Sequence, residues 1–218
     1  MPSLPAGLRS RVPNRLRDDV RLRALAVGLG AIPPRTMHSR EDAAVLLRAA
    51  RGARRVVEIG VYEGSSALAL CRELAPDAEL HLIDPFGHHP DALPRGWGAT
   101  EWATRRAVGR ASRGGPNVRW HIALSETVAE GFDGQVDLVF IDGDHSEEGA
   151  RRDWDAWRRF VAPGGHVVLH DARADQPGGR GLPGPTALAG QIRSGVDGGW
   201  QIVDEADRTV AVRRAELT

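Results

Sequence analysis

The stretch Val56-Val57-Glu58-Ile59-Gly60-Val61-Tyr62-Glu63-Gly64-Ser65-Ser66 joins a short apolar run to the first turn of a helix. Its two glycines let the backbone turn tightly and let a ligand approach the chain closely. The helix that starts at Ser65 offers free N–H groups and the positive end of its dipole to an anion. The stretch therefore predicts a strand, a tight turn and a helix, with a ligand site at the turn.

Other apolar runs of strand length follow along the chain and alternate with helical patterns. The expected strands cover residues 56–59, 80–83, 118–122, 136–141 and 167–169, and helical spacing covers residues 65–74 and 146–160. Such alternation is typical of βαβ units with a parallel sheet. Two last runs, 200–203 and 209–212, predict an antiparallel hairpin. The expected fold class is α/β, with a doubly wound, mostly parallel seven-stranded sheet that carries helices on both faces.

The segment before the first strand predicts a helical cap. Pro33 and Pro34 break any long helix there, and the apolar residues 24–32 suit a docked helix. Ser39-Arg40-Glu41-Asp42 resembles a capping box that opens a helix through Ala50. We therefore interpret residues 1–218 as a single domain. Residues 1–53 form its N-terminal cap, which could also serve as the arm of a homodimer, and residues 54–218 form its catalytic α/β core.

Charge and cysteine content narrow the function classes. The 29 basic residues, all arginines, balance 29 acidic residues, so the electrostatic case for a nucleic-acid partner is weak. A single cysteine, Cys71, excludes an internal disulfide and a cysteine-based zinc site. The apolar stretch at 24–32 is too short to cross a membrane. We expect a cytoplasmic protein that acts on a small-molecule substrate, without a nucleic-acid or membrane partner.

The first candidate site surrounds the glycine turn. A dinucleotide fingerprint has three glycines for the pyrophosphate, whereas this turn has only Gly60 and Gly64, and it follows an acid, Glu58. That acid would repel a pyrophosphate, but it can accept hydrogen bonds from an ammonium group. A ligand with both an ammonium and a carboxylate suits Glu58 and the helix start at Ser65 and Ser66. The methionine end of S-adenosylmethionine is such a ligand.

Two further positions complete the expected cofactor site. Asp84 ends the second strand, about 24 residues after Gly60, where a carboxylate can accept bonds from both ribose hydroxyls. The turn Ala123-Leu124-Ser125 follows the third strand, where an adenine ring would lie.

The second candidate site follows the fourth and fifth strands. The fourth strand runs into Asp142-Gly143-Asp144-His145, and the fifth runs into His170-Asp171. Oxygen and imidazole groups at two strand ends suit a divalent cation, for which we nominate Asp142, His170 and Asp171. Asp142 also borders the cofactor site and shares catalysis with His145, the expected general base, whose ordinary pKa lies near working pH. The alternative is that His145 caps the next helix and His170 packs against a neighbour.

Two loops are expected to border the substrate. Residues 85–105 are long enough for a lid, and they contain His88, His89, Trp97 and Trp102, to which the pattern assigns no role. Residues 172–185 are rich in Gly and Pro, which predicts a loop before a helix at about 186–194.

From about Arg54 to Asp171 the chain resembles the class I S-adenosylmethionine-dependent methyltransferases. The matching residues are Val57-Glu58-Ile59-Gly60-x3-Gly64-Ser65-Ser66, Asp84, Phe140-Ile141-Asp142-Gly143-Asp144-His145, and Pro163-Gly164-Gly165 leading to His170-Asp171. Within that family the chain looks most like the small-molecule O-methyltransferases of bacterial natural-product biosynthesis, including macrolide-sugar methyltransferases. The resemblance implies cofactor binding at Glu58, Gly60 and Asp84. It also implies metal binding at Asp142 and His170-Asp171, with His145 as the catalytic base.

The chain departs from that family pattern after the fifth strand. Some relatives carry two carboxylates where this chain has His170 and Asp171, and catechol-type relatives carry Asn where this chain has Ala172. An imidazole ligand makes Mn²⁺ or a later transition ion more suitable than an all-oxygen site would. The expected cofactors are S-adenosylmethionine and a divalent metal, Mg²⁺ or Mn²⁺.

Four functional hypotheses follow. The leading one is metal-assisted O-methylation of a hydroxyl on a sugar or secondary metabolite. A second keeps the cofactor without a metal, and His145 or Asp144 then deprotonates an amine or hydroxyl. A third is a dinucleotide-dependent oxidoreductase, against which Glu58 argues. A fourth is a non-catalytic scaffold, which predicts that replacing His145 or Asp142 leaves biological function intact.

Overall fold

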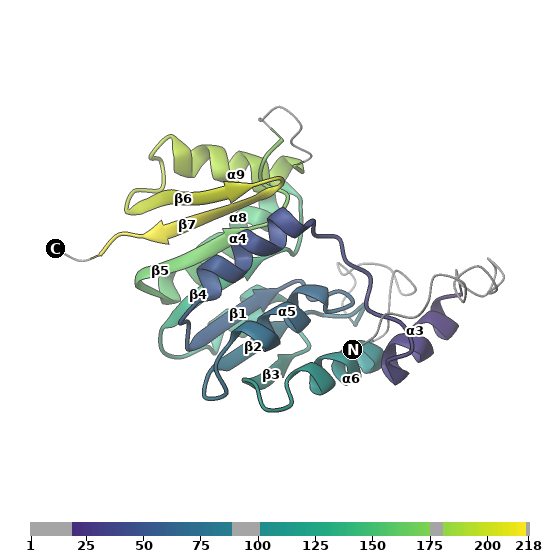
Figure 1. Ribbon diagram of the computed structural model, residues 1–218. Helices are drawn as coiled ribbons and strands as arrows, with labels where there is room; N and C mark the ends of the chain where they lie inside the picture. The colour runs from purple at the N-terminus through teal and green to yellow at the C-terminus, as the bar shows by residue number, and fades with distance from the viewer. Residues whose placement is uncertain (1–18, 89–100, 175–180, 217–218) are drawn as a thin grey trace.

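The computed structural model describes residues 19–88, 101–174 and 181–216. They form a seven-stranded sheet in the order β3-β2-β1-β4-β5-β7-β6, with helices on both faces (Figure 1). The strands are β1 (Arg55–Ile59), β2 (Glu79–Ile83), β3 (Asn117–His121), β4 (Val136–Ile141), β5 (Val161–Leu169), β6 (Trp200–Ala206) and β7 (Thr209–Arg214). The helices are α3 (Val20–Leu29), α4 (Arg40–Ala50), α5 (Ser65–Glu73), α6 (Glu101–Ala111), α7 (Ser125–Glu130), α8 (Glu147–Trp157), the 3₁₀ turn η1 (Arg158–Phe160) and α9 (Pro183–Arg193). The predicted fold class is confirmed.

The strand order determines where the sheet can bind a ligand. We call the edge formed by the carboxyl ends of the parallel strands the ligand edge. β1 pairs in parallel with both β2 and β4, and β4 pairs in parallel with β5. β7 runs antiparallel to both β5 and β6 as the expected hairpin. From β1 the chain moves outward to β2 and β3 and then returns to β4, so β1 and β4 flank a topological switch point. In doubly wound sheets ligands bind there, beyond the carboxyl ends of the strands.

The central strands are buried on both faces, as expected for a parallel sheet. Alternate residues of β1 point to opposite layers, so Val56 packs with α4 and α5 while Val57 packs with α8 and α9. Trp154 and Trp157 of α8 are fully buried in the second layer. Glu58 is the exception, because this acid lies completely buried within the apolar strand.

Several element boundaries differ from the sequence prediction. Residues 101–105 begin α6 rather than continuing a loop, and neither α6 nor the short α7 has a counterpart in the prediction. β5 starts at Val161, because a register shift against β4 accommodates the Pro163-Gly164 pair within the strand. α9 starts at Pro183 instead of Thr186, since proline is compatible with the first turn of a helix.

The N-terminal cap contacts both the sheet and α6. α3 packs along α6 (Figure 1). Trp102 of α6 lies over Gly28, where even a Cβ atom would meet the ring at 2.2 Å. The predicted capping box at Ser39 is confirmed: its side chain accepts from the Asp42 N–H, and the Asp42 carboxylate accepts from the Ser39 N–H. Residues 1–18 of the expected cap lie outside the described residues. In the described ranges, no helix combines the length and apolar character needed to cross a membrane.

Candidate active site

Four strand ends converge at the ligand edge. Ile59 at the end of β1 lies in register with Ile83 of β2 and with Ile141 of β4, and Ile141 lies in register with Leu169 of β5. Tyr62, Phe86 and Asp171, in the turns after β1, β2 and β5, adopt positive φ angles that non-glycine residues rarely take. Strained backbone of this kind gathers at functional sites. The geometry thus points to the edge that the sequence nominates.

The glycine turn brings the ends of β1 and β4 into contact. Gly60 has φ +84°, and a Cβ atom at this position would lie 2.1 Å from the backbone oxygen of Asp142. Gly64, also left-handed at φ +85°, precedes the first residue of α5. Only glycine satisfies both the conformation and the close approach at position 60.

Glu58 lies at the base of this turn. The Ser66 hydroxyl donates a hydrogen bond to Glu58 Oε1, while Oε2 is buried and has no hydrogen-bond partner among the described residues. Burial raises the pKa of Glu58 to about 8, against the hydrogen bond from Ser66. A buried carboxylate oxygen without a partner is costly unless a ligand completes it. The atom fits an ammonium group that approaches over the glycine turn.

The predicted ribose and adenine positions also lie at this edge. Asp84 Oδ2 accepts from the N–H groups of Val61 and Tyr62 at 2.9 and 2.8 Å, so the carboxylate braces the glycine turn. Burial raises the Asp84 pKa against these bonds. Ser125 is buried and donates to the carboxylate of Asp153 on α8, which fixes the turn Ala123-Leu124-Ser125.

The second cluster brings together residues from β4 and β5. Asp142, His145, His170 and Asp171 each offer one donor atom, and these four atoms lie within 4.8 Å of one another. His170 Nδ1 lies 3.0 Å from Asp142 Oδ1, and His145 Nε2 lies 3.4 Å from both Asp142 Oδ1 and Asp171 Oδ2. His145 Nε2 is buried and makes no hydrogen bond within the described ranges. Ser146, not His145, caps α8. The donor set and the unsatisfied nitrogen fit a divalent cation.

The electrostatics of this cluster are those of imidazolium–carboxylate pairs. Burial disfavours the Asp142 carboxylate, but the neighbouring imidazoles of His145, His170 and His38 outweigh it and hold the Asp142 pKa well below its usual range. Burial likewise disfavours charged imidazoles, yet the neighbouring carboxylates raise the pKa of His145 to about 9 and that of His170 to about 11. Both side chains are therefore positively charged imidazolium ions at pH 7 in this arrangement. Each must lose one of its two ring protons before the nitrogen can serve as a base or a metal ligand.

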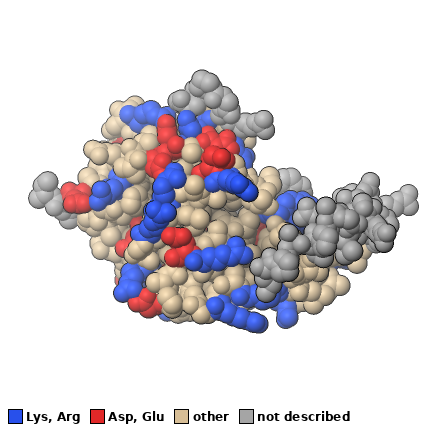
Figure 2. All heavy atoms as spheres, viewed as in Figure 1, with Lys and Arg blue, Asp and Glu red and all other residues tan. Residues whose placement is uncertain are grey.

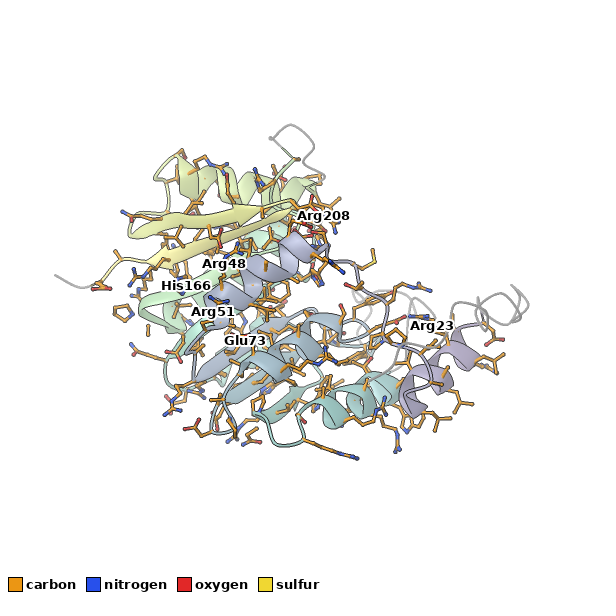
Figure 3. All side chains as sticks on the ribbon, in the orientation of Figure 1. Arg23, Arg48, Arg51, Glu73, His166 and Arg208 are labelled. Carbon is orange, nitrogen blue, oxygen red and sulfur yellow. The ribbon has the colours of Figure 1, made fainter. Side chains whose placement is uncertain are left out.

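The structure adds three residues that the sequence prediction missed. His38 Nε2 lies 3.1 Å from Asp142 Oδ2, and Arg208 Nη1 lies 2.9 Å from Asp171 Oδ1. Asp42 is fully buried, with Oδ2 at 3.7 Å from His170 Nε2. His38 and Asp42 come from the start of α4, and Arg208 comes from the β6–β7 turn above it (Figure 3). Asp42 carries the only sequence signal of the three, as a member of the capping box.

The two candidate sites share a boundary. A cavity of about 40 Å³, room for about one water molecule, is lined by His38 and Asp42 on one side and by Ser65 and Ser66 on the other.

The first of the expected substrate loops is described only in part. His88 is exposed and lies 3.1 Å from Glu101 Oε2, whereas His89 and Trp97 lie outside the described residues.

Comparison with known proteins identifies the chemistry that such an edge supports. Residues 57–172, more than half of the chain, match a family model described as a methyltransferase domain. The O-methyltransferase TomG from Streptomyces achromogenes, solved with SAM, is 18% identical, with 94% of this chain and 91% of that chain covered and a TM-score of 0.60. Cofactor-bound Rv0187 from MTB is 20% identical over the whole of both chains, with a TM-score of 0.62. An O-methyltransferase from Bacillus cereus, solved with SAH, is 17% identical, with 93% and 92% covered and a TM-score of 0.58. These likenesses establish a shared fold.

Proposed function

The chain belongs to the methyltransferase family whose model matches residues 57–172, and we propose that it transfers the methyl group of S-adenosylmethionine to a small-molecule hydroxyl with help from a divalent cation. In this reaction the acceptor oxygen forms a bond to the methyl carbon while the carbon–sulfur bond breaks. Its electron pair stays on sulfur, S-adenosylhomocysteine leaves, and the hydroxyl proton passes to a base. Family membership favours this chemistry over the hydride transfer of a dinucleotide-dependent oxidoreductase.

The observation that carries the proposal is Glu58 Oε2 at the base of a glycine turn, an atom without a hydrogen-bond partner in the part of the chain that the structure describes. An ammonium group placed there would donate to this oxygen. The carboxylate of the same amino acid would meet the free N–H groups of Ser65 and Ser66 at the start of α5. Asp84 would then face the ribose, and the turn Ala123-Leu124-Ser125 would face the adenine.

For the cation we assign Asp142, His170 and Asp171 as ligands, next to the cofactor turn. A divalent cation held by these residues would lower the pKa of the acceptor hydroxyl and help to orient it. His145 is kept protonated here by Asp142 and Asp171. Carboxylates engaged with a cation would hold the His145 proton less strongly, and a neutral His145 would be the base that accepts the hydroxyl proton.

A metal-independent form is the second candidate, and the charge balance of the cluster favours it. The carboxylates of Asp42, Asp142 and Asp171 face the cations of His145, His170 and Arg208. Three negative and three positive charges already cancel. In this form His145 or Asp144 accepts the proton from an amine or a hydroxyl.

We further propose a small, non-nucleic-acid acceptor of the sugar or secondary-metabolite type. Acidic and basic side chains are interspersed on the face in Figure 2, without the continuous basic surface that a nucleic acid needs. Leu22, Leu25 and Leu29 of α3 are exposed, which supports a homodimer through the cap. A cytoplasmic location remains part of this proposal.

Methyl transfer from radiolabelled S-adenosylmethionine to a panel of sugars, phenols and amines tests the proposal. The reactions are run with Mg²⁺, with Mn²⁺ and with EDTA. Transfer to hydroxyl acceptors that requires a metal supports the first form, and transfer that survives EDTA supports the second. No transfer to any acceptor, together with no binding of the cofactor, would contradict both.

A further inference from the structure

Asp142 and His170 each turn one polar atom toward the candidate metal cluster and the other away from it. Asp142 Oδ1 faces the cluster, 3.0 Å from His170 Nδ1, while Asp142 Oδ2 faces His38 Nε2 at 3.1 Å. His170 Nδ1 faces the cluster, while Nε2 faces Asp42 Oδ2 at 3.7 Å. The His170 side chain is 1% exposed and the Asp42 side chain is completely buried. His38 therefore lies within hydrogen-bond distance behind Asp142, and Asp42 lies behind His170 Nε2, which has no hydrogen-bond partner among the described residues.

Both supporting residues lie outside the segment that matches the methyltransferase family model. His38 and Asp42 stand at the start of α4, just before and inside its capping box, whereas the model matches residues 57–172. His38 is separated from Asp142 by 104 positions in the chain. The His38 ring also packs edge-on against the His170 ring, with centroids 4.3 Å apart. The linker that follows α3 thus closes over the cluster.

Hydrogen bonds from two parts of the chain fix the position of the Asp42 carboxylate. Its Oδ2 accepts from the N–H of Ser39 at 3.0 Å, and its Oδ1 accepts from the N–H of Arg208 at 3.0 Å and from the Thr209 hydroxyl at 2.8 Å. The Arg208 side chain reaches Asp171 from the same turn. Asp42 is therefore anchored to both α4 and the β6–β7 hairpin, and its distance to His170 is set by the fold.

We propose that His38 and Asp42 are positioning residues for the metal ligands, so that the N-terminal cap forms part of the cation site. The His38 N–H donates to Oδ2 of Asp142 and leaves Oδ1 free for the cation. The negative charge of Asp42, 3.7 Å from Nε2 of His170, favours a proton on that nitrogen and leaves the Nδ1 lone pair as the ligand. Partners of this kind typically change metal affinity by about 10- to 100-fold. The inference rests on the metal-assisted form of the proposed function.

Binding of Mn²⁺ alone to the full chain, followed by electron paramagnetic resonance, tests the proposal. The variants are His38→Ala, His38→Gln and Asp42→Asn. We expect His38→Ala and Asp42→Asn to weaken Mn²⁺ binding by about 10- to 100-fold and to alter the spectrum of the bound ion. His38→Gln keeps an N–H donor, and we expect it to stay within about 3-fold of the wild type, a small fraction of the loss on removing the partner.

A matched control separates positioning from folding. Arg48→Ala removes an ion pair of the same helix and leaves the hydrogen bonds of Asp42 in place (Figure 3). It should bind Mn²⁺ like the wild type, even where thermal melting shows lower stability. If Asp42→Asn does not fold, the proposal is tested by the difference in Mn²⁺ affinity between His38→Ala and His38→Gln.

Equal Mn²⁺ affinity in the wild type, His38→Ala and Asp42→Asn would overturn the positioning role and leave the metal site intact. Absence of Mn²⁺ binding to the wild type would overturn both this inference and the metal-assisted function. Methyl transfer itself would then stand in its metal-independent form. The two failures are therefore distinguished by the wild-type titration.

Discussion

The Ser66 hydroxyl donates a hydrogen bond to Glu58 Oε1 inside the molecule, and it leaves Oε2 of the same carboxyl buried without a partner in the described part of the chain. Burial raises the pKa of this carboxyl to about 8. At pH 7 the free protein therefore holds Glu58 mainly in its neutral form. A ligand ammonium group stabilises the carboxylate instead, so binding and ionisation are coupled.

This coupling predicts proton release when S-adenosylhomocysteine binds. Calorimetric titration at pH 7 in buffers of different ionisation enthalpy should report release of most of one proton, because a group with a pKa of about 8 is mainly protonated there. At pH 9 the release should be much smaller. Glu58→Gln should abolish the release and weaken binding by about 10- to 100-fold, the loss of one charge-assisted hydrogen bond. Equal proton release from wild type and variant would contradict the role of Glu58.

Substitution of Gly60 should disrupt the contact between the glycine turn and the end of β4. In Gly60→Ala the added Cβ would lie 2.1 Å from the backbone oxygen of Asp142, at a φ of +84° that alanine disfavours. We expect loss of S-adenosylhomocysteine binding and destabilisation by more than about 2 kcal/mol in urea denaturation, the upper range of most single substitutions.

Gly52→Ala is the matched control for this substitution. Gly52 also has a positive φ, +76°, but a Cβ atom there would have no neighbour within 4 Å among the residues that the structure describes. It should cost about 1 kcal/mol and leave cofactor binding unchanged. Similar losses of stability and of cofactor binding in both variants would show that the positive φ angle, and not the close approach to Asp142, causes the effect of Gly60→Ala.

Asp153 should make stability depend on pH. Burial raises its pKa from 3.8 to about 6, against the hydrogen bond from Ser125. The folded state then binds more protons than the unfolded state between these values, so stability falls as pH rises from about 4 to 6, by up to about 3 kcal/mol. Asp153→Asn should remove this decline in urea denaturation series. Asp155→Asn, at a half-exposed position of the same helix, should retain it.

His145 should affect turnover without affecting cofactor affinity. We expect His145→Gln to lower kcat by about 100- to 10,000-fold, the range for loss of a general base, while S-adenosylhomocysteine binds as in the wild type. His166→Gln, on β5 and away from the carboxyl end of that strand, should keep full activity. A His145 variant with wild-type turnover would show that a base other than His145 accepts the proton.

The sequence predicts the sheet well because its strands are continuous apolar runs, and it predicts the glycine turn because Gly60 and Gly64 follow such a run. It misses α6, whose buried face consists mainly of small residues such as Ala103, Thr104 and Ala107, which give a weak periodic signal. α7 has only six residues, too few for a helical pattern.

The nearest neighbours of the acid–histidine cluster could not be predicted in the same way. His38 and Arg208 reach Asp142 and Asp171 from segments far away in the chain, and nothing local marks either as a site residue. Asp42 has a local explanation as a capping residue, which conceals its contact with His170. Contacts of this kind arise only when the sheet, α4 and the final hairpin are assembled.

The most direct test of the account is calorimetric titration of S-adenosylhomocysteine into the wild-type protein with Mg²⁺, with Mn²⁺ and with EDTA. The account predicts micromolar binding under all three conditions, because Glu58, the glycine turn and the start of α5 hold the ligand without the cation. No binding under any condition, with NAD binding in its place, would contradict it.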